Sequence, residues 1–342
     1  MIYYVPKNIE SLVSIFIISI IVAFITIIIG LSVPTKTFGQ LLDIQQQQQQ
    51  KDSNSNRVVI LTFGNAPKSQ YTYAKPILDK YGFKASFFVV CDWIPSDKEE
   101  QDDNSDDMTW QDIETLHNEG HDIETKSFDH KDLTHLTISD LDFEVGESKR
   151  CLADHNINSR VFGTPYGKGW DNSTVIDTIA KYYDFAITGF SNLMYLKCDG
   201  WNKDQEEQDY QSNIQTDCRT YFDDGTLTYA NRYSIREWSH DSADKENQDN
   251  DQKTFEEFVK VVNSQDNYNN NNNNNNENGI IKAIPIIAYH DLDYGERIPG
   301  STDVNLFDAE MKYLYDNAFT VITMADLGYD ENTNQLYIKQ IG

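Results

Sequence analysis

Residues 58–66 read VVILTFGNA, and the apolar, β-branched run Val58–Phe63 at the start of this stretch is typical of a strand. A helical pattern follows at Tyr73–Lys80, and a second strand-like run follows at Ala85–Val90. Gly82 lies between the two, where the C-cap of a helix belongs. A strand, a helix and another strand in this order indicate an α/β fold with a parallel sheet.

The same alternation continues along the chain. Further strand-like runs are predicted at Asp122–Thr125, Ser159–Gly163, Phe185–Thr188, Asn231–Ile235, Lys282–Tyr289 and Phe319–Thr323. Helical patterns are predicted at Thr109–Glu119, Ser139–His155, Asn172–Tyr183, Thr254–Val262 and Asn305–Asp316. Because about eight strands alternate with helices, the sequence predicts a (β/α) barrel.

The two ends of the chain differ in composition. We predict a membrane anchor at residues 1–34, because Ser11–Val33 is uncharged and, at about 1.5 Å per residue, long enough to cross a bilayer as a helix. This apolar segment is longer than that of an ordinary cleavable signal peptide. The sequence does not decide whether the segment is cleaved. Residues 35–56 are rich in Gln and Asn and predict a flexible linker. One domain is expected at 57–330, with low-complexity insertions at 95–107, 203–212, 239–252 and 267–278.

The charge of the chain restricts its partners. Of 342 residues, 55 are Asp or Glu and 28 are Lys or Arg, which gives a formal net charge of −27. So negative a field repels phosphate and argues against nucleic-acid binding and against attraction to anionic lipid. The acidic runs within the insertions are interpreted as solvated loops.

Common catalytic and metal-binding motifs do not occur in the sequence. G-x-S-x-G, G-x-G-x-x-G, Walker A, H-E-x-x-H and C-x-x-C are all absent. A nucleophile-elbow hydrolase, a nucleotide-binding loop and a structural zinc site therefore have no support.

Four separated segments together resemble the polysaccharide deacetylase (NodB-homology) family, carbohydrate esterase family four. They are VVILTFGNA at 58–66 with KASFFV at 84–89, GHDIETKSFDHKDLTHL at 120–136, FGTPYG at 162–167, and PIIAYHDL at 285–292. The resemblance implies a distorted (β/α) barrel, a divalent metal, commonly zinc, and hydrolysis of N- or O-acetyl groups on a polysaccharide. This reaction needs a metal that polarises the acetyl carbonyl, a carboxylate base and a general acid.

Several positions depart from the family pattern. By the resemblance, Gly64 stands at the position of the base, and Asn65 stands at that of a ligating aspartate. The two ligating histidines correspond to Lys126 and His130, so His130 is the one ligand kept. An ammonium group has no lone pair for a metal. Two outcomes are open for Lys126, namely pairing with a carboxylate or extension of its side chain to solvent.

Two further positions of the family pattern are retained, and two are replaced. His290 matches the general acid, and Tyr166 would supply a backbone N–H to the oxyanion, with Pro165 beside it on the substrate side. The arginine that orients the base is replaced by Gly163, and Ala288 stands where a leucine usually lines the acetate pocket. No cofactor is therefore expected, or zinc if the site is active.

These departures favour a membrane-anchored deacetylase-like protein that acts on a cell-envelope glycan and has lost metal-dependent catalysis. Its body is expected outside the cytoplasm, with the membrane and a polysaccharide as its partners. The alternative is an active metal-dependent deacetylase with a rearranged site, in which Asp122, Asp129 or Asp291 supplies the carboxylate. The sequence leaves open which of the two the chain is.

The cysteines and one sequon add further expectations. An extracytoplasmic location permits disulfides, and Cys198 and Cys218 flank an insertion, so they are the expected pair; two free thiols are the alternative. Asn172-Ser173-Thr174 is the one N-x-S/T sequon of the chain, and the sequence does not decide whether it is occupied.

Overall fold

The structure is a computed structural model that describes residues 57–95, 106–170, 172–196, 231–240, 251–269, 281–295, 300–333 and 335–339. The predicted anchor at Ser11–Val33, the linker and most of the predicted insertions lie outside these residues. Within the described part, no helix combines the length and the apolar character that a membrane span requires. All described residues belong to one compact unit, residues 54–342.

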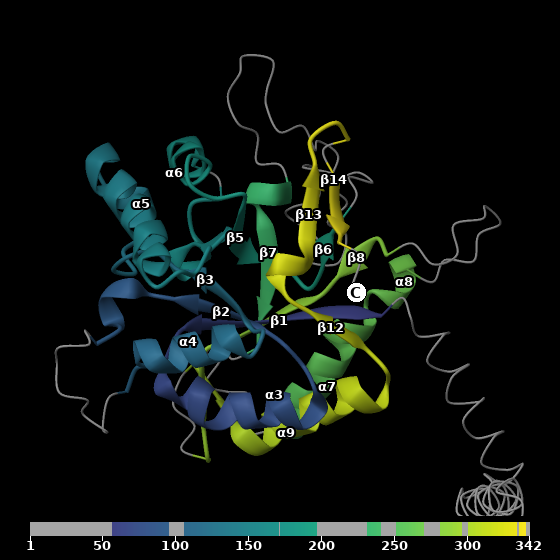
Figure 1. Ribbon diagram of the computed structural model, residues 1–342. Helices are drawn as coiled ribbons and strands as arrows, with labels where there is room; N and C mark the ends of the chain where they lie inside the picture. Colours follow the sequence, from purple (N-terminus) through teal and green to yellow (C-terminus); the bar gives the residue numbers. More distant parts are fainter. Residues whose placement is uncertain are drawn as a thin grey trace, which may run out of the picture. The chain divides into compact units, whose positions relative to one another are not determined.

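Seven parallel strands close into a barrel (Figure 1). They are β1 (Val58–Asn65), β2 (Ser86–Val89), β3 (Asp122–Thr125), β4 (Val161–Gly163), β5 (Phe185–Phe190), β7 (Ile235–Ser239) and β9 (Ile286–Tyr289). The ring closes because β1 pairs with β2 on one side and with β9 on the other, where Leu61 lies opposite Ile287. The predicted (β/α) barrel is confirmed, and β12 (Thr320–Ile322) pairs with the first residues of β1 as an additional strand.

Helices cover the outside of the barrel. They are α3 (Lys75–Tyr81), α4 (Trp110–Asn118), α5 (Ile138–Asp154), α6 (Ser173–Ile179), α7 (Asp251–Asn263), the short α8 (Asp266–Asn269) and α9 (Val304–Asp316). Polar side chains begin several of them: Thr109 caps α4, Thr137 caps α5 and Asp303 caps α9. Each cap accepts a hydrogen bond from a backbone N–H of the first turn that has no partner within the helix.

Three small sheets complete the described fold. β6 (Met194–Tyr195) pairs antiparallel with β8 (Ala283–Ile284), and β10 (Asp291–Asp293) pairs parallel with β11 (Ser301–Asp303). β13 (Leu327–Asp330) and β14 (Gln335–Ile338) form an antiparallel hairpin, so the folded chain continues past residue 330.

The strands separate the core inside the barrel from two clusters beneath the helices, because their side chains alternate between the two faces. Leu61 and Phe63 of β1 belong to the larger of these two clusters, whereas Ile60 belongs to the core inside the barrel. Phe63 stacks on Phe87 and Tyr289, with ring centroids 4.8 and 5.5 Å away. Truncating a fully buried aromatic side chain such as Phe63 to alanine costs about 3–5 kcal/mol.

Two predicted strands differ in their bounds. Asn231–Tyr233 forms a short helical turn, and β7 begins only at Ile235. The strand was not predicted at its true position because its sequence, IREWS, is polar. The predicted strand Lys282–Tyr289 is divided into β8 and β9 at Pro285, which has no N–H for a sheet hydrogen bond.

A disulfide joins Cys91, directly after β2 and Val90, to Cys151 on α5. The bond closes a loop with a sequence separation of 60. In the chain-entropy account, closing so long a loop stabilises the fold by about 4 kcal/mol. The sequence did not single out this pair, and the expected pair, Cys198 and Cys218, lies outside the described residues.

Candidate functional site

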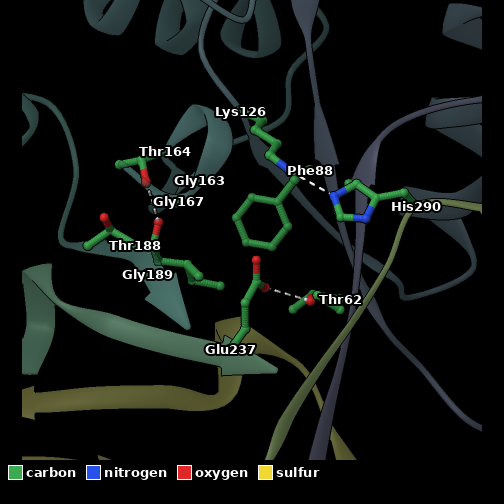
Figure 2. Close-up of a pocket in the computed structure, with 13 residues that line it drawn as sticks. Thr62, Phe88, Lys126, Gly163, Thr164, Gly167, Thr188, Gly189, Glu237 and His290 are labelled. Atoms are coloured by element: carbon green, nitrogen blue, oxygen red, sulfur yellow. Dashed lines mark hydrogen bonds between the residues drawn. The ribbon is translucent and has the colours of Figure 1, made fainter. Parts of the chain in front are cut away.

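A cavity lies at the carboxyl ends of the barrel strands (Figure 2). Its charged and titratable lining consists of Lys126, Glu237 and His290. Gly64, Gly163, Gly167 and Gly189 form much of its wall. In (β/α) barrels, active sites are built at this end, where residues from several strands converge.

Lys126 and His290 meet inside this cavity. Lys126 follows β3, is 8% exposed, and its Nζ lies 3.2 Å from Nε2 of His290. Since an ammonium group only donates, Nε2 of a neutral His290 is the acceptor in this contact. The expectation that Lys126 extends to solvent is therefore wrong.

Gly64 makes the position of Lys126 sterically accessible. A Cβ atom on residue 64 would lie 2.8 Å from Lys126 Nζ and 2.8 Å from His290 Cδ2. The lysine therefore occupies the space into which a side chain at the base position would extend.

Gly163 has a similar relation to its neighbours. A Cβ atom there would lie 2.9 Å from Phe88 Cδ1 and 3.4 Å from Lys126 Cγ. Phe88 and Lys126 thus fill the start of the path that an arginine at position 163 would take.

His130 lies at the rim of the site between two aromatic rings. Its ring centroid is 5.2 Å from that of Trp93 and 4.8 Å from that of Tyr166. Burial, followed by the charge of Lys126, lowers the pKa of His130 to about 4, so the ring is neutral at physiological pH. Its Nε2 atom is buried and has no hydrogen-bond partner among the described residues.

Left-handed backbone conformations gather at this end of the barrel. Asn65, Ser127, His130 and Tyr166 have φ angles of 75°, 67°, 54° and 61°. A non-glycine residue in this region costs of order 1 kcal/mol, and such strain concentrates at functional sites. The mouth of the barrel therefore keeps a costly backbone arrangement at several of the positions matched by the family motifs.

The donors present do not fit a divalent metal. Asn65 Oδ1 and His130 Nε2 are buried acceptors without partners in the described part of the chain, but both are neutral, and the third ligand position is the ammonium of Lys126. No three His, Cys, Asp or Glu side chains among the described residues form a group that could hold a metal. Zinc sites in proteins use three or four such side chains.

Glu237 is a site residue that sequence analysis missed. It extends from β7, and its Oε2 accepts a hydrogen bond of 2.9 Å from Thr62 Oγ1 on β1, two strands away in the ring. Figure 2 shows the Thr62–Glu237 pair and the Lys126–His290 pair around the ring of Phe88. The predicted strand ended at Ile235, two residues earlier; extending its alternation by one inward position would have found Glu237.

None of the three aspartates considered for a rearranged site lines the cavity. Asp129 forms an ion pair with Lys131 at 2.6 Å, and Asp291 accepts a hydrogen bond from Ser69. Asp122 lies at the amino end of β3 and accepts a 2.8 Å hydrogen bond from Ser86 Oγ.

The remaining predicted residues lie near the cavity. Tyr166 is 57% exposed at the rim, and Pro165 is buried at the start of the short turn Pro165–Gly167. Ala288 lines the cavity beside His290.

Gln70, which sequence analysis also missed, connects two of the strand ends. Its buried side chain donates from Nε2 to the carbonyl oxygens of Gly64 and His290, each at 2.7 Å. This amide fixes the backbone on both sides of the Lys126 side chain.

The fold is a closed parallel barrel, and Lys126, Glu237 and His290 line a cavity at the carboxyl ends of its strands. These features define a (β/α)-barrel protein with a candidate site at the strand ends. The sequence model of the polysaccharide deacetylase family matches residues 51–186. This match supports the resemblance of the three motif segments within that range to the polysaccharide deacetylase (NodB-homology) family, carbohydrate esterase family four.

Individual relatives are distant. The protein named Putative polysaccharide deacetylase YxkH, from Bacillus subtilis (strain 168), is 26% identical over 135 residues, which are 39% of this chain and 45% of that protein. The match therefore spans less than half of the relative's length.

Two solved structures show similarity at low sequence identity. The Xyl-CE4 domain of a multidomain xylanase from the hindgut metagenome of Trinervitermes trinervoides is 15% identical, with a TM-score of 0.45 over 79% of this chain and 88% of that one. BA3943, a CE4 family pseudoenzyme from Bacillus anthracis, is 13% identical, with a TM-score of 0.46 over 80% of this chain and 65% of that one.

Proposed function

We propose that this chain is a deacetylase-like protein that binds a cell-envelope polysaccharide and does not hydrolyse its acetyl groups by the metal-dependent route. The observation that carries the proposal is the position of Lys126, whose Nζ lies beside His290 where a side chain of residue 64 would begin. The same ammonium thus takes the space of the base and the place of a metal ligand.

The chemistry of acetyl hydrolysis explains why these changes matter. A water molecule must lose a proton to a base while a cation polarises the carbonyl group. Residue 64 has no side chain to accept the proton. At the ligand positions His130 is retained, and Asn65 offers a neutral amide in place of a carboxylate. A positive charge on Lys126 opposes a dication at the same place.

The rim of the site supports carbohydrate binding. Trp93 is 37% exposed and Tyr166 is 57% exposed, and the two rings flank His130. Exposed aromatic rings beside a polar cavity are typical of ligand sites, because a ring offers apolar area with a polar edge. A sugar ring, with apolar faces and hydroxyl groups around its edge, matches this surface.

Two features support a membrane-anchored body outside the cytoplasm. The apolar sequence Ser11–Val33 is long enough for a spanning helix. The Cys91–Cys151 disulfide is a bond that persists in oxidising compartments and is rare in the cytosol.

The deciding experiment measures metal content and acetate release on the same purified protein. We expect less than stoichiometric metal by elemental analysis and no acetate from chitin oligomers or peptidoglycan. We also expect oligomer binding by calorimetry, weakened in Trp93→Ala and unchanged in the exposed control Tyr315→Ala on α9. Stoichiometric metal with measurable turnover would establish the alternative, and absence of binding to every glycan would remove the carbohydrate role.

Glu237 favours one specific version of the alternative. Among the described residues that line the cavity, Glu237 is the one that carries a carboxylate, so it could accept a proton from water there. If the purified protein releases acetate, Glu237→Gln should abolish turnover with little change in oligomer affinity. An equally active Glu237→Gln variant would exclude this carboxylate as the base.

A further inference from the structure

We infer that Asn172 carries an N-linked glycan whose first sugar lies in a groove beside the candidate site. Asn172, Ser173 and Thr174 form the sequon at the start of α6. Ser173 and Thr174 are exposed, so the sequon is at the surface, as the modification requires.

The side chain of Asn172 is oriented by the helix that it caps. Its Oδ1 accepts a hydrogen bond of 3.3 Å from the backbone N–H of Val175. This capping hydrogen bond uses Oδ1 and does not involve Nδ2. Glycosylation modifies Nδ2, so it does not require the capping hydrogen bond of Oδ1 to break.

Asn172 and Ser173 line a groove of about 650 Å³. Its other walls include His135, Lys168 and Trp170. The volume lies within the usual range for small-ligand sites, roughly 300–1,000 Å³. A sugar attached to Nδ2 begins inside this groove.

The groove is suited to a sugar. Trp170 lines the groove with its indole, and the guanidinium of Arg236 lies 5.0 Å from the centroid of this ring. Lys168 forms an ion pair of 2.6 Å with Asp132 at the same end. An aromatic face with polar groups around it binds the apolar face and the hydroxyl groups of one sugar ring.

The groove and the candidate cavity meet at Gly167, which lines both. A glycan at Asn172 therefore lies directly beside the site proposed for a substrate polysaccharide. It would cover one side of the barrel mouth and limit how a longer glycan can approach from that side.

The modification is a group transfer from a lipid-linked donor of the secretory pathway. A bond forms between Nδ2 of Asn172 and C1 of an N-acetylhexosamine, and the bond from C1 to a diphospholipid breaks. The lipid diphosphate leaves, and Nδ2 loses one proton. The inference rests on the proposed extracytoplasmic location, where this donor is available.

The test is the mass of the residue 172 peptide from the full-length chain produced in insect cells, before and after peptide N-glycosidase treatment. We expect a glycan on wild type and on Thr174→Ser, which keeps the sequon, and none on Thr174→Ala, which keeps the Asn172 cap. An unmodified Asn172 in wild type overturns the inference. If Cys91 and Cys151 are then disulfide-bonded, the glycan inference alone fails; if they are reduced, the proposed location fails with it.

The position of the sugar has a separate readout. We expect peptide N-glycosidase to release the glycan several-fold more slowly from folded than from denatured wild type, and Trp170→Ala to speed release from the folded protein. Equal rates for folded and denatured wild type would show that the sugar does not lie in the groove.

Discussion

Lys126 Nζ lies 3.2 Å from His290 Nε2, in the space that a side chain on residue 64 would enter. Two departures from the family pattern, Gly64 and Lys126, are therefore one structural change. The lysine is accommodated because position 64 has no side chain, and a base cannot return to position 64 without displacing the lysine.

Gly64→Ala should destabilise the protein by about 1–3 kcal/mol, because its Cβ overpacks Lys126 and His290. In a Lys126→Ala background the cost should fall without vanishing, since the contact with His290 Cδ2 persists. Urea unfolding of the four proteins in this double-mutant cycle measures the coupling. Fully additive effects would show that Lys126 does not occupy this space.

Restoring the metal positions tests the proposed loss of catalysis. Lys126→His alone should give no activity, because Gly64 still offers no base. Gly64→Asp, Asn65→Asp and Lys126→His together should restore metal binding, measured by elemental analysis and zinc titration, and slow acetate release. A folded triple variant without metal affinity would mean that these positions are not the family's ligand positions.

Acid should weaken the fold through two buried histidines. Burial lowers the pKa of His130 to about 4, and burial followed by the charge of Lys84 lowers that of His121 to about 4. Because both folded pKa values lie below the unfolded value, the unfolded state binds more protons between pH 4 and 6.5. Their stabilisation is complete above about pH 6.5 and is lost as the pH falls toward 4, by about 1–3 kcal/mol for each group.

Chemical unfolding between pH 4 and 7 measures this slope. His130→Leu should remove about half of it, because His121 remains. A ring-proton titration of His130 by NMR with a midpoint near 6.5 would contradict the prediction.

Glu124 should change the stability in the opposite direction, so that its contribution decreases as the pH rises. It is fully buried, and burial together with the charge of Asp122 raises its pKa well above the usual range. For a carboxyl whose folded pKa is raised, stability is greatest below the unfolded pKa and is lost as the pH rises through the folded one. Glu124→Gln should therefore raise the unfolding free energy above that of wild type, and this gain should be about 1 kcal/mol or more larger at pH 8 than at pH 5.

The amide retains the shape of the protonated acid and an oxygen for the three groups that donate to Oε2, namely Ser159 Oγ, Arg160 N and Val161 N. A matched control is Glu144→Gln, which loses an ion pair of 3.2 Å with Lys131 and should not gain stability. Loss of stability in Glu124→Gln at every pH would show that the carboxylate form is the native one.

Much of the fold could be predicted from the sequence because each strand and helix carries its own local signal. The apolar run at Val58–Phe63 and the capping residues Thr109 and Gly82 fix their elements within a residue or two. Strand β7 was misplaced because Arg236, Glu237 and Ser239 give it a polar sequence, and its place is decided by pairing with β5 and β9.

The family motifs identified the positions around the cavity, and the structure brings Gly64, Lys126 and His290 into contact. Glu237 and Gln70 were missed because their roles depend on partners far along the chain, Thr62 for one and His290 for the other. The Cys91–Cys151 bond was missed for the same reason, since the packing of α5 against the short turn Cys91–Trp93 after β2 brings the two sulfurs together.

The pairing of β1 with β9 has a consequence for how the chain folds during its synthesis on the ribosome. These partners lie near the two ends of the folded body, so the ring cannot close until almost the whole chain has emerged. Until then β1 presents an unpaired edge that can pair with a neighbouring nascent chain. The Cys91–Cys151 bond joins segments that emerge early, so it can hold the first strands together while the last partner is still being synthesised.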